Sequence, residues 1–401
     1  MEVPDPGDLI SRIPHSSGLA WVRRGEGLVG WGEAARLPVP PGADRFVWAR
    51  ERVADLFGRM DVEDHVGEPG SGPVAFCTFT FDPHAAGSVL IVPSTILARR
   101  NGRAWTTTVG VPPPSPVTPV RPPSGVTYED DYAGAVDWMR CVEKALSVLG
   151  SGRLGKVVLA RSIGAFAAEP IDARALLLRL AGRFPGCYAF AVDGLVGATP
   201  ELLLRRTHDR VESLVLAGTT RRGRDEEEDV GLAAALSSSA KDRSEHAYAV
   251  DSVRAALQDL CIGLRADPEP HVLPLANVQH LATSIAGRLR AHHSILDVTA
   301  ALHPTPAVCG SPAETAMDLI RELEPTGRAR YAGPVGWLDG AGNGELGIAL
   351  RCAEVSGHQA RLYAGCGIVA GSDPAAELAE TRLKFEAMQH AIGADPPLGT
   401  P

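Results

Sequence analysis

The stretch GKVVLARS, from Gly155 to Ser162, places one lysine directly before a short apolar run that contains two valines. Such a run is typical of a buried strand. Moving an ammonium group out of water costs several kcal/mol unless the group is paired or loses its proton. In one interpretation, Lys156 lies just outside the strand and reaches water with its side chain. In the other, the lysine has a function that the rest of the chain must support.

The sequence around this stretch alternates between helical and strand patterns. Apolar residues recur at helical spacing from Val136 to Leu149, and Asp172, Ser311 and Asp373 are expected helix N-caps, the last two with a proline after them. Between these segments lie runs rich in β-branched residues: AFAVDGLVGA, GPVGWLDG, GELGIALRC and ARLYAGCGIV. The pattern predicts a mixed α/β chain with a large sheet.

A proline-rich segment divides the chain. Residues 111–125, VPPPSPVTPVRPPSG, contain seven prolines and predict an extended connector. Short apolar runs and glycine turns before it predict a strand-rich N-terminal portion, residues 1–124. We expect this portion to pack onto the main unit, residues 125–395, and to complete one of its sheets.

Composition excludes several classes of protein. The chain of 401 residues is 22% charged, has a formal net charge of −9 and contains no basic block, so nucleic acid is not an expected partner. It has no apolar run of the roughly 20 residues that a membrane helix needs, and its start, MEVPDPGDLI, does not resemble a secretion signal. The seven cysteines form no CxxC pair and predict reduced core residues, so we expect a cytoplasmic protein.

One generic motif has an ordinary explanation. Residues Gly342 to Gly347 satisfy GxGxxG, but a dinucleotide fingerprint must open a helix, and this segment lies between two strand-like runs. A hairpin turn is therefore the preferred interpretation.

Several acidic residues stand near basic ones. Glu201 follows a turn in GATPELLLRR, whereas Glu245 and Glu380 lie in helical patterns. The pairs Lys241 with Glu245 and Glu380 with Lys384 have i,i+4 spacing, so each, taken alone, predicts a surface salt bridge.

Taken in order, nine blocks resemble the chorismate-utilising enzymes, the family of anthranilate, salicylate and isochorismate synthases. The blocks lie between Gly155 and Met388: GKVVLAR, GATPELLL, LAGTTRRG, KDRSEH, VQHLAT, HPTPAVCG, GELGIALR, RLYAGCGIVAGSDP and ELAETRLK. The resemblance implies an α/β fold in which two facing β-sheets are covered by helices, with the active site in the cleft between them.

The isochorismate synthases are the most similar group within this family. By resemblance, Lys156 activates water and Glu201 is the general acid, while Glu245 and Glu380 bind Mg²⁺. The resemblance also implies a set of substrate-binding residues: Gly218, Thr219, His280, Ala307, Arg351, Gly365 and Lys384. Arg351 and Lys384 would hold the carboxylates of chorismate.

These residue types suit the isomerisation of chorismate to isochorismate, in which water adds at C2 and the C4 hydroxyl leaves. One group must take a proton and another must give one, and burial favours the neutral forms of both a lysine and a carboxyl. Mg²⁺ commonly uses one or two protein carboxylates together with substrate oxygens. Arg351 can form planar, charge-assisted hydrogen bonds to a carboxylate.

Three alternatives stay open. A salicylate synthase uses the same catalytic pair and also eliminates pyruvate, but it typically carries threonine where this chain has Ala307. An anthranilate or aminodeoxychorismate synthase component would need a glutaminase partner, and Lys156 disfavours it. A non-catalytic chorismate-binding protein would be expected to have lost at least one of the proposed catalytic residues and metal ligands, which are Lys156, Glu201, Glu245 and Glu380. We expect a monomeric enzyme without a glutaminase subunit, and its pathway, menaquinone, siderophore or another metabolite, stays open.

Overall fold

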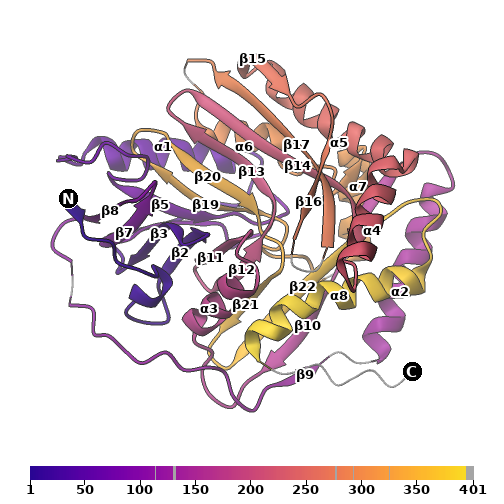
Figure 1. The fold of residues 1–401 in the computed structure, drawn as a ribbon, viewed down its shortest axis with the longest axis horizontal. Coiled ribbons are helices and arrows are strands. Elements are labelled where there is room, and N and C mark those ends of the chain that lie inside the picture. The colour runs from indigo at the N-terminus through magenta and orange to yellow at the C-terminus, as the bar shows by residue number, and fades with distance from the viewer. Residues whose placement is uncertain (113, 130–131, 276–277, 292, 325, 394–401) are drawn as a thin grey trace.

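The computed structural model describes residues 1–112, 114–129, 132–275, 278–291, 293–324 and 326–393. In these residues the strands form two antiparallel sheets, with helices packed around them (Figure 1). The predicted α/β class and the two-sheet architecture are confirmed. No helix of the described residues is both long and apolar enough to span a membrane.

The first sheet has 12 strands, in the order β1-β8-β7-β3-β2-β11-β12-β21-β22-β10-β18, with β9 paired to β10. Their bounds are β1 (Glu2–Val3), β2 (Leu19–Arg23), β3 (Glu26–Trp31), β7 (Thr95–Arg100), β8 (Arg103–Thr108), β9 (Thr127–Glu129), β10 (Lys156–Phe166), β11 (Tyr188–Val192), β12 (Leu195–Thr199), β18 (Gly310–Ser311), β21 (Cys352–Ser356) and β22 (Gln359–Ile368). The longest pairing in this sheet joins β10 to β22, from Val157 with Ile368 to Phe166 with Gln359.

The second sheet has 10 strands, in the order β15-β17-β14-β13-β20-β19-β5-β6-β4, with β16 paired to β17. Their bounds are β4 (Ala35–Pro38), β5 (Val74–Thr78), β6 (Val89–Val92), β13 (Leu202–Thr207), β14 (Arg210–Arg221), β15 (Cys261–Ala266), β16 (His271–Pro274), β17 (Val278–Leu289), β19 (Pro334–Asp339) and β20 (Gly344–Ile348).

The helices lie around these sheets: α1 (Arg45–Gly58), α2 (Tyr132–Leu149), α3 (Ala173–Arg183), α4 (Glu226–Ser238), α5 (Ala240–Gln258), α6 (Ile295–Leu302), α7 (Ala313–Leu323) and α8 (Pro374–Ile392), with a short 3₁₀ helix at Ile10–Arg12. Helices α3 and α8 pack on each other and on the first sheet, whereas α5 and α6 pack on β14 and β13 of the second. In Figure 1, α8 crosses in front of β22 and β10.

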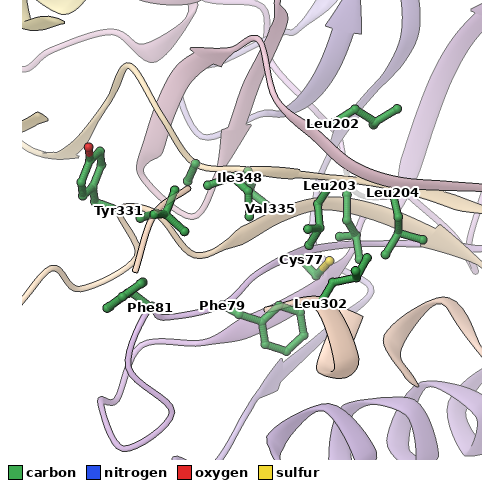
Figure 2. Packing of buried hydrophobic residues seen from close by; sticks show 14 of the residues in the cluster. Cys77, Phe79, Phe81, Leu202, Leu203, Leu204, Leu302, Tyr331, Val335 and Ile348 are labelled. Atoms are coloured by element: carbon green, nitrogen blue, oxygen red, sulfur yellow. The ribbon is translucent and has the colours of Figure 1, made fainter. Parts of the chain in front are cut away.

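Side chains from both sheets form a common core. Its largest buried members include Trp21 of β2, Phe190 of β11, Phe76 of β5 and Trp337 of β19. Figure 2 shows another part of this core, where Leu203 and Leu204 of β13 point toward Cys77 and Leu302, whereas Leu202 points to the other side of the strand. A second core lies under α3 and α8. Removing this apolar surface from water provides the main stabilisation of the two-sheet arrangement.

The N-terminal strands are integrated into both sheets. Strands β1, β2, β3, β7 and β8 extend the first sheet, and β4, β5 and β6 extend the second. The expectation that this portion completes one sheet was therefore too narrow.

The proline-rich connector runs outside the sheets (Figure 1). The buried Arg174 holds it, because this guanidinium donates to the carbonyl oxygens of Thr118 and Pro14, both at 2.9 Å, and to the carboxylate of Asp172 at 2.7 Å. Of the predicted connector, Pro113 lies outside the described residues.

Most local predictions agree with the structure. Asp172 and Asp373 cap α3 and α8 through their side chains, and the GxGxxG segment spans the turn between β19 and β20. The cap predicted at Ser311 is wrong: Ser311 lies in β18, and Pro312 occupies the cap position of α7 without a side-chain hydrogen bond. Pairing of Ser311 with Lys156 in the sheet displaces the helix start.

Candidate active site

Two crossovers between the sheets place two of the predicted residues side by side. Glu201 lies where the chain passes from β12 to β13, and Arg351 lies where it returns from β20 to β21. The crossovers are hydrogen bonded to each other: the Ile348 amide donates to the Glu201 carbonyl and the Ala198 amide donates to the Arg351 carbonyl, both at 3.1 Å. Arg351 has φ of 48°, in the left-handed region that few side-chain-bearing residues adopt. The backbone thus fixes both residues in one place.

The Glu201 carboxyl is held near its neutral form. Burial raises the pKa of Glu201 to about 7, and the positive charges of Lys156 and Arg351 oppose this rise. The desolvation of a carboxylate therefore outweighs the attraction of two cations. A carboxyl with this pKa can give up a proton near neutral pH, as a general acid must.

Lys156 occupies the first position of β10 and does not extend freely into water. Its Nζ atom lies 2.5 Å from Oε1 of Glu245 on α5, and 21% of its side chain is exposed. Gly367 of β22 gives the lysine room, since a Cβ atom there would lie 2.6 Å from the lysine Cε. Lys156 can therefore lie at the start of a buried strand because its ammonium group is paired with a carboxylate.

A second lysine of the candidate site, Lys384, lies on α8. Its Nζ atom donates to the Gly365 carbonyl at 2.7 Å and lies 2.6 Å from Oε1 of Glu380. The i,i+4 pair expected for Glu380 and Lys384 is thus present, whereas Glu245 pairs with Lys156. Gly365 and Gly367 are two residues apart in β22 and share one face of that strand. Both lysines therefore lie next to the same short segment.

His280 of β17 faces the same charges. Burial and, next, the positive charges of Arg351 and Lys384 lower the pKa of His280 to about 4, because both disfavour the imidazolium. Its Nδ1 atom is 2.9 Å from the Thr219 hydroxyl. Gly218 forms a bulge beside this pair with φ of 75°, where a Cβ atom would lie 3.2 Å from Asp242 of α5. The structure therefore presents a neutral histidine beside two cations.

A small cavity joins several of these residues. It has a volume of about 80 Å³ and brings Ala307, Arg351, Gly365 and Lys384 together. Its other lining residues are Val158, Val308, Arg328, Tyr331, Ala332, Leu350, Cys366 and Gly367. Ala307 also lines a neighbouring cavity that contains Glu201. Five of the predicted residues, Glu201, Ala307, Arg351, Gly365 and Lys384, thus line two cavities that share Ala307.

The two predicted metal ligands offer the right donor type for Mg²⁺. Glu245 and Glu380 each present a partly exposed carboxylate that touches one lysine, with 34% and 48% of the side chain exposed. In the part of the chain that the structure describes, no group of three or more acidic, histidine or cysteine side chains could hold a metal. Mg²⁺ commonly uses one or two protein carboxylates and fills its other positions with waters and substrate oxygens.

Sequence reasoning missed a buried ion pair that supports the site. Arg328 donates to Glu324 and to the Val308 carbonyl, both at 2.7 Å, and Glu324 accepts from the Ala160 amide at 2.8 Å. The pair therefore ties the loop of Ala307 to strand β10. The segment EPTGRARYAG carries charges that resemble a surface loop, so nothing in its pattern indicated burial.

Comparison with known proteins identifies the family of this chain. A family model described as chorismate binding enzyme matches residues 115–393. A Mycobacterium tuberculosis protein provisionally named isochorismate synthase MenF is 40% identical over 340 residues, which cover 81% of this chain and 88% of that protein. The isochorismate synthase DhbC of Bacillus subtilis is 42% identical over 271 residues, 65% of this chain and 68% of the relative.

A solved structure has the same overall fold. The menaquinone-specific isochorismate synthase MenF of Escherichia coli superposes with a TM-score of 0.80 at 27% identity, covering 98% of this chain and 93% of that chain. The family match and the 40% identity over most of the length carry the conclusion that this chain belongs to the chorismate-binding enzymes.

Proposed function

We propose that this chain is an isochorismate synthase, an isomerase that converts chorismate to isochorismate in the presence of Mg²⁺. The observation that carries the proposal is the Glu201 carboxyl, whose pKa burial raises to about 7 while the positive charges of Lys156 and Arg351 oppose the rise. Water addition at C2 with loss of the C4 hydroxyl needs one base and one acid.

In this proposal, Lys156 removes a proton from the attacking water and Glu201 protonates the departing C4 hydroxyl. The Nζ atom of Lys156 lies 2.5 Å from Oε1 of Glu245, which is also a proposed Mg²⁺ ligand. A ligand that binds the Glu245 carboxylate would break this contact and free the Lys156 side chain. Positive charge from Arg351 and Lys384 would attract the two carboxylates of the substrate, and Arg351 can bind one of them in a planar, two-pronged contact.

Glu245 and Glu380 are the residues that would hold Mg²⁺. When bound, the ion would draw electron density from the ring carboxylate and so favour attack at C2. The neutral His280, with the Thr219 hydroxyl at 2.9 Å, would offer a hydrogen bond to the substrate without adding charge.

Ala307 favours isochorismate over salicylate as the product. Its methyl side chain lines both the cavity with Arg351 and the cavity with Glu201. A threonine there would add a methyl and a hydroxyl beside the ring and could hold the enolpyruvyl group in position for elimination. With alanine, the product is freer to leave before pyruvate is lost.

The test is to incubate the purified chain with chorismate and Mg²⁺, without ammonia, and to identify the products by NMR. We expect isochorismate in a mixture with chorismate, formed by a monomer that needs no glutaminase. Stoichiometric pyruvate and salicylate would instead make the chain a salicylate synthase. Unchanged chorismate would sink the proposal.

A further inference from the structure

Thr305 carries a buried hydroxyl without a protein partner. The residue is 7% exposed and lies in the loop between α6 and β18. Its carbonyl accepts from the amides of Val308 and Cys309 at 3.1 and 3.0 Å, which fixes the loop. Among the described residues, none hydrogen bonds to its Oγ1 atom. A buried hydroxyl without a partner is unfavourable, so the position calls for water or a function.

Two cavities meet at this residue. The smaller, about 20 Å³, is lined by Thr305, Glu201, Ser213 and Ala307 together with apolar residues. A cavity needs about 10–15 Å³ to hold one water molecule, so this space suits a single water. Thr305, Glu201 and Ser213 carry the polar side chains of this lining, and the Ser213 hydroxyl already donates to the Leu203 carbonyl at 2.7 Å.

The larger cavity, about 330 Å³, lies on the other side of Thr305. Its lining includes the hydroxyl side chains of Tyr248, Ser252 and Ser311, and Tyr248 is 54% exposed, so the cavity reaches solvent. It is large enough for several waters at roughly 30 Å³ each. Thr305 thus carries the polar side chain that lines both cavities: the larger one, which reaches solvent, and the smaller one, which Glu201 also lines.

The proposed reaction needs a route of this kind. In each turnover Glu201 gives its proton to the leaving hydroxyl and must regain one before the next turnover. Lys156 gains a proton from the attacking water, and its side chain is 21% exposed, so it can return that proton to solvent. While substrate or product lies between the two residues, the front of Glu201 is covered.

We propose that Thr305 is a proton-relay residue that returns a proton from the larger cavity to Glu201. The threonine hydroxyl gives its proton to the water of the smaller cavity, that water protonates the Glu201 carboxylate, and the hydroxyl takes a replacement proton from water in the larger cavity. One proton enters at Glu201 for each proton that leaves from Lys156, so the isomerisation stays balanced. This inference rests on the proposed function.

The test compares Thr305→Val, which keeps the shape and removes the hydroxyl, with Thr305→Ser, which keeps the hydroxyl. The valine variant is expected to fold because the hydroxyl has no protein partner to lose. Rapid-quench measurements give the rate of the first turnover and the steady-state rate. We expect valine to leave the first turnover within twofold of the unmodified chain and to lower the steady-state rate at least tenfold. Product would then appear as a burst of one equivalent, and serine would behave like the unmodified chain.

Three outcomes would overturn the relay. If both rates of the valine variant match the unmodified chain, the hydroxyl is not needed; if both fall together, Thr305 only supports the structure. Should the valine variant fail to fold, Thr305→Ala and Thr305→Ser differ by one oxygen, and equal steady-state rates for these two would overturn the relay. An unmodified chain that leaves chorismate unchanged would instead refute the proposed function.

Discussion

Two glutamates near the common core of the two sheets, the buried Glu345 and the partly buried Glu201, have different surroundings. Glu345 lies near the start of β20. Its carboxylate accepts hydrogen bonds from Trp21 at 2.7 Å, from Arg205 at 2.9 Å and from Arg100 at 3.1 Å. Glu201 lies near the opposite end of the same strand pair, and among the described residues no side chain donates a hydrogen bond to its carboxyl.

The difference separates a structural charge from a reactive one. At Glu345, two arginines compensate for the loss of water: Arg100 pairs with it from the first sheet, and Arg205 pairs with it from the neighbouring strand of the second sheet. At Glu201, the nearby cations lower the pKa less than burial raises it. A cavity of about 690 Å³ lies at the Glu345 end, so cavity size alone would point away from the candidate active site.

Metal removal should have the largest effect, and only at the Glu201 end. The lysine pairs of Glu245 and Glu380 can exchange a lysine for Mg²⁺, whereas Glu345 is already saturated by arginines. We expect EDTA to abolish the conversion of chorismate and added Mg²⁺ to restore it, without a change in the midpoint of urea unfolding. Glu245→Gln and Glu380→Gln should lose turnover while remaining folded. Full activity in EDTA would contradict the metal assignment.

Neutralising each glutamate should separate their roles in turnover. Glu201→Gln cannot donate a proton, so turnover should fall about 10²–10⁴-fold, the range for a lost general acid. Glu345→Gln, the matched control, should keep turnover within about threefold of the unmodified chain. Turnover of the unmodified chain should also decline as the pH rises above about 7, because the Glu201 carboxyl then loses its proton. Normal turnover in Glu201→Gln would eliminate it as the acid.

The sequence predicted local features well because neighbouring residues determine them. Helix α2 follows the apolar spacing from Val136 to Leu149, and the caps of α3 and α8 need only an aspartate and the amides that follow it. The family resemblance predicted the two-sheet arrangement, which the alternation of strands and helices alone left open.

Features that depend on distant segments were not predictable from local pattern. Helical spacing paired Glu245 with Lys241, but the strand start at Lys156 brings a different lysine to 2.5 Å. The burial of Arg328 and the unpartnered hydroxyl of Thr305 arise only when the loop before β18 packs against β10. Polar residues of this kind resemble surface residues until the tertiary structure is known.

The free energy of unfolding should reveal the cost of ionising Glu201 in the folded chain. Between about pH 4.5 and pH 7 the folded chain retains a proton that the unfolded chain releases, so stability falls as the pH rises through this window. Glutamine is neutral at every pH and avoids this loss. Glu201→Gln should therefore equal the unmodified chain in stability near pH 4 and exceed it at pH 8 by up to roughly 3 kcal/mol. Urea unfolding at both pH values measures this difference, and a less stable variant at pH 8 would refute it.

The same substitution at Glu345 should change stability in the opposite direction and by a smaller amount. Glutamine can still accept the Trp21 hydrogen bond, but it leaves Arg100 and Arg205 without the charge that compensates for their burial. Breaking a fully buried pair costs about 3–5 kcal/mol, and the loss here should be nearer 2 kcal/mol because 31% of the Arg205 side chain is exposed. Urea unfolding of Glu345→Gln at pH 8, beside Glu201→Gln, makes the comparison direct. If both variants gain stability, or both lose it, then the partners around each carboxylate do not determine which glutamate is structural and which is reactive.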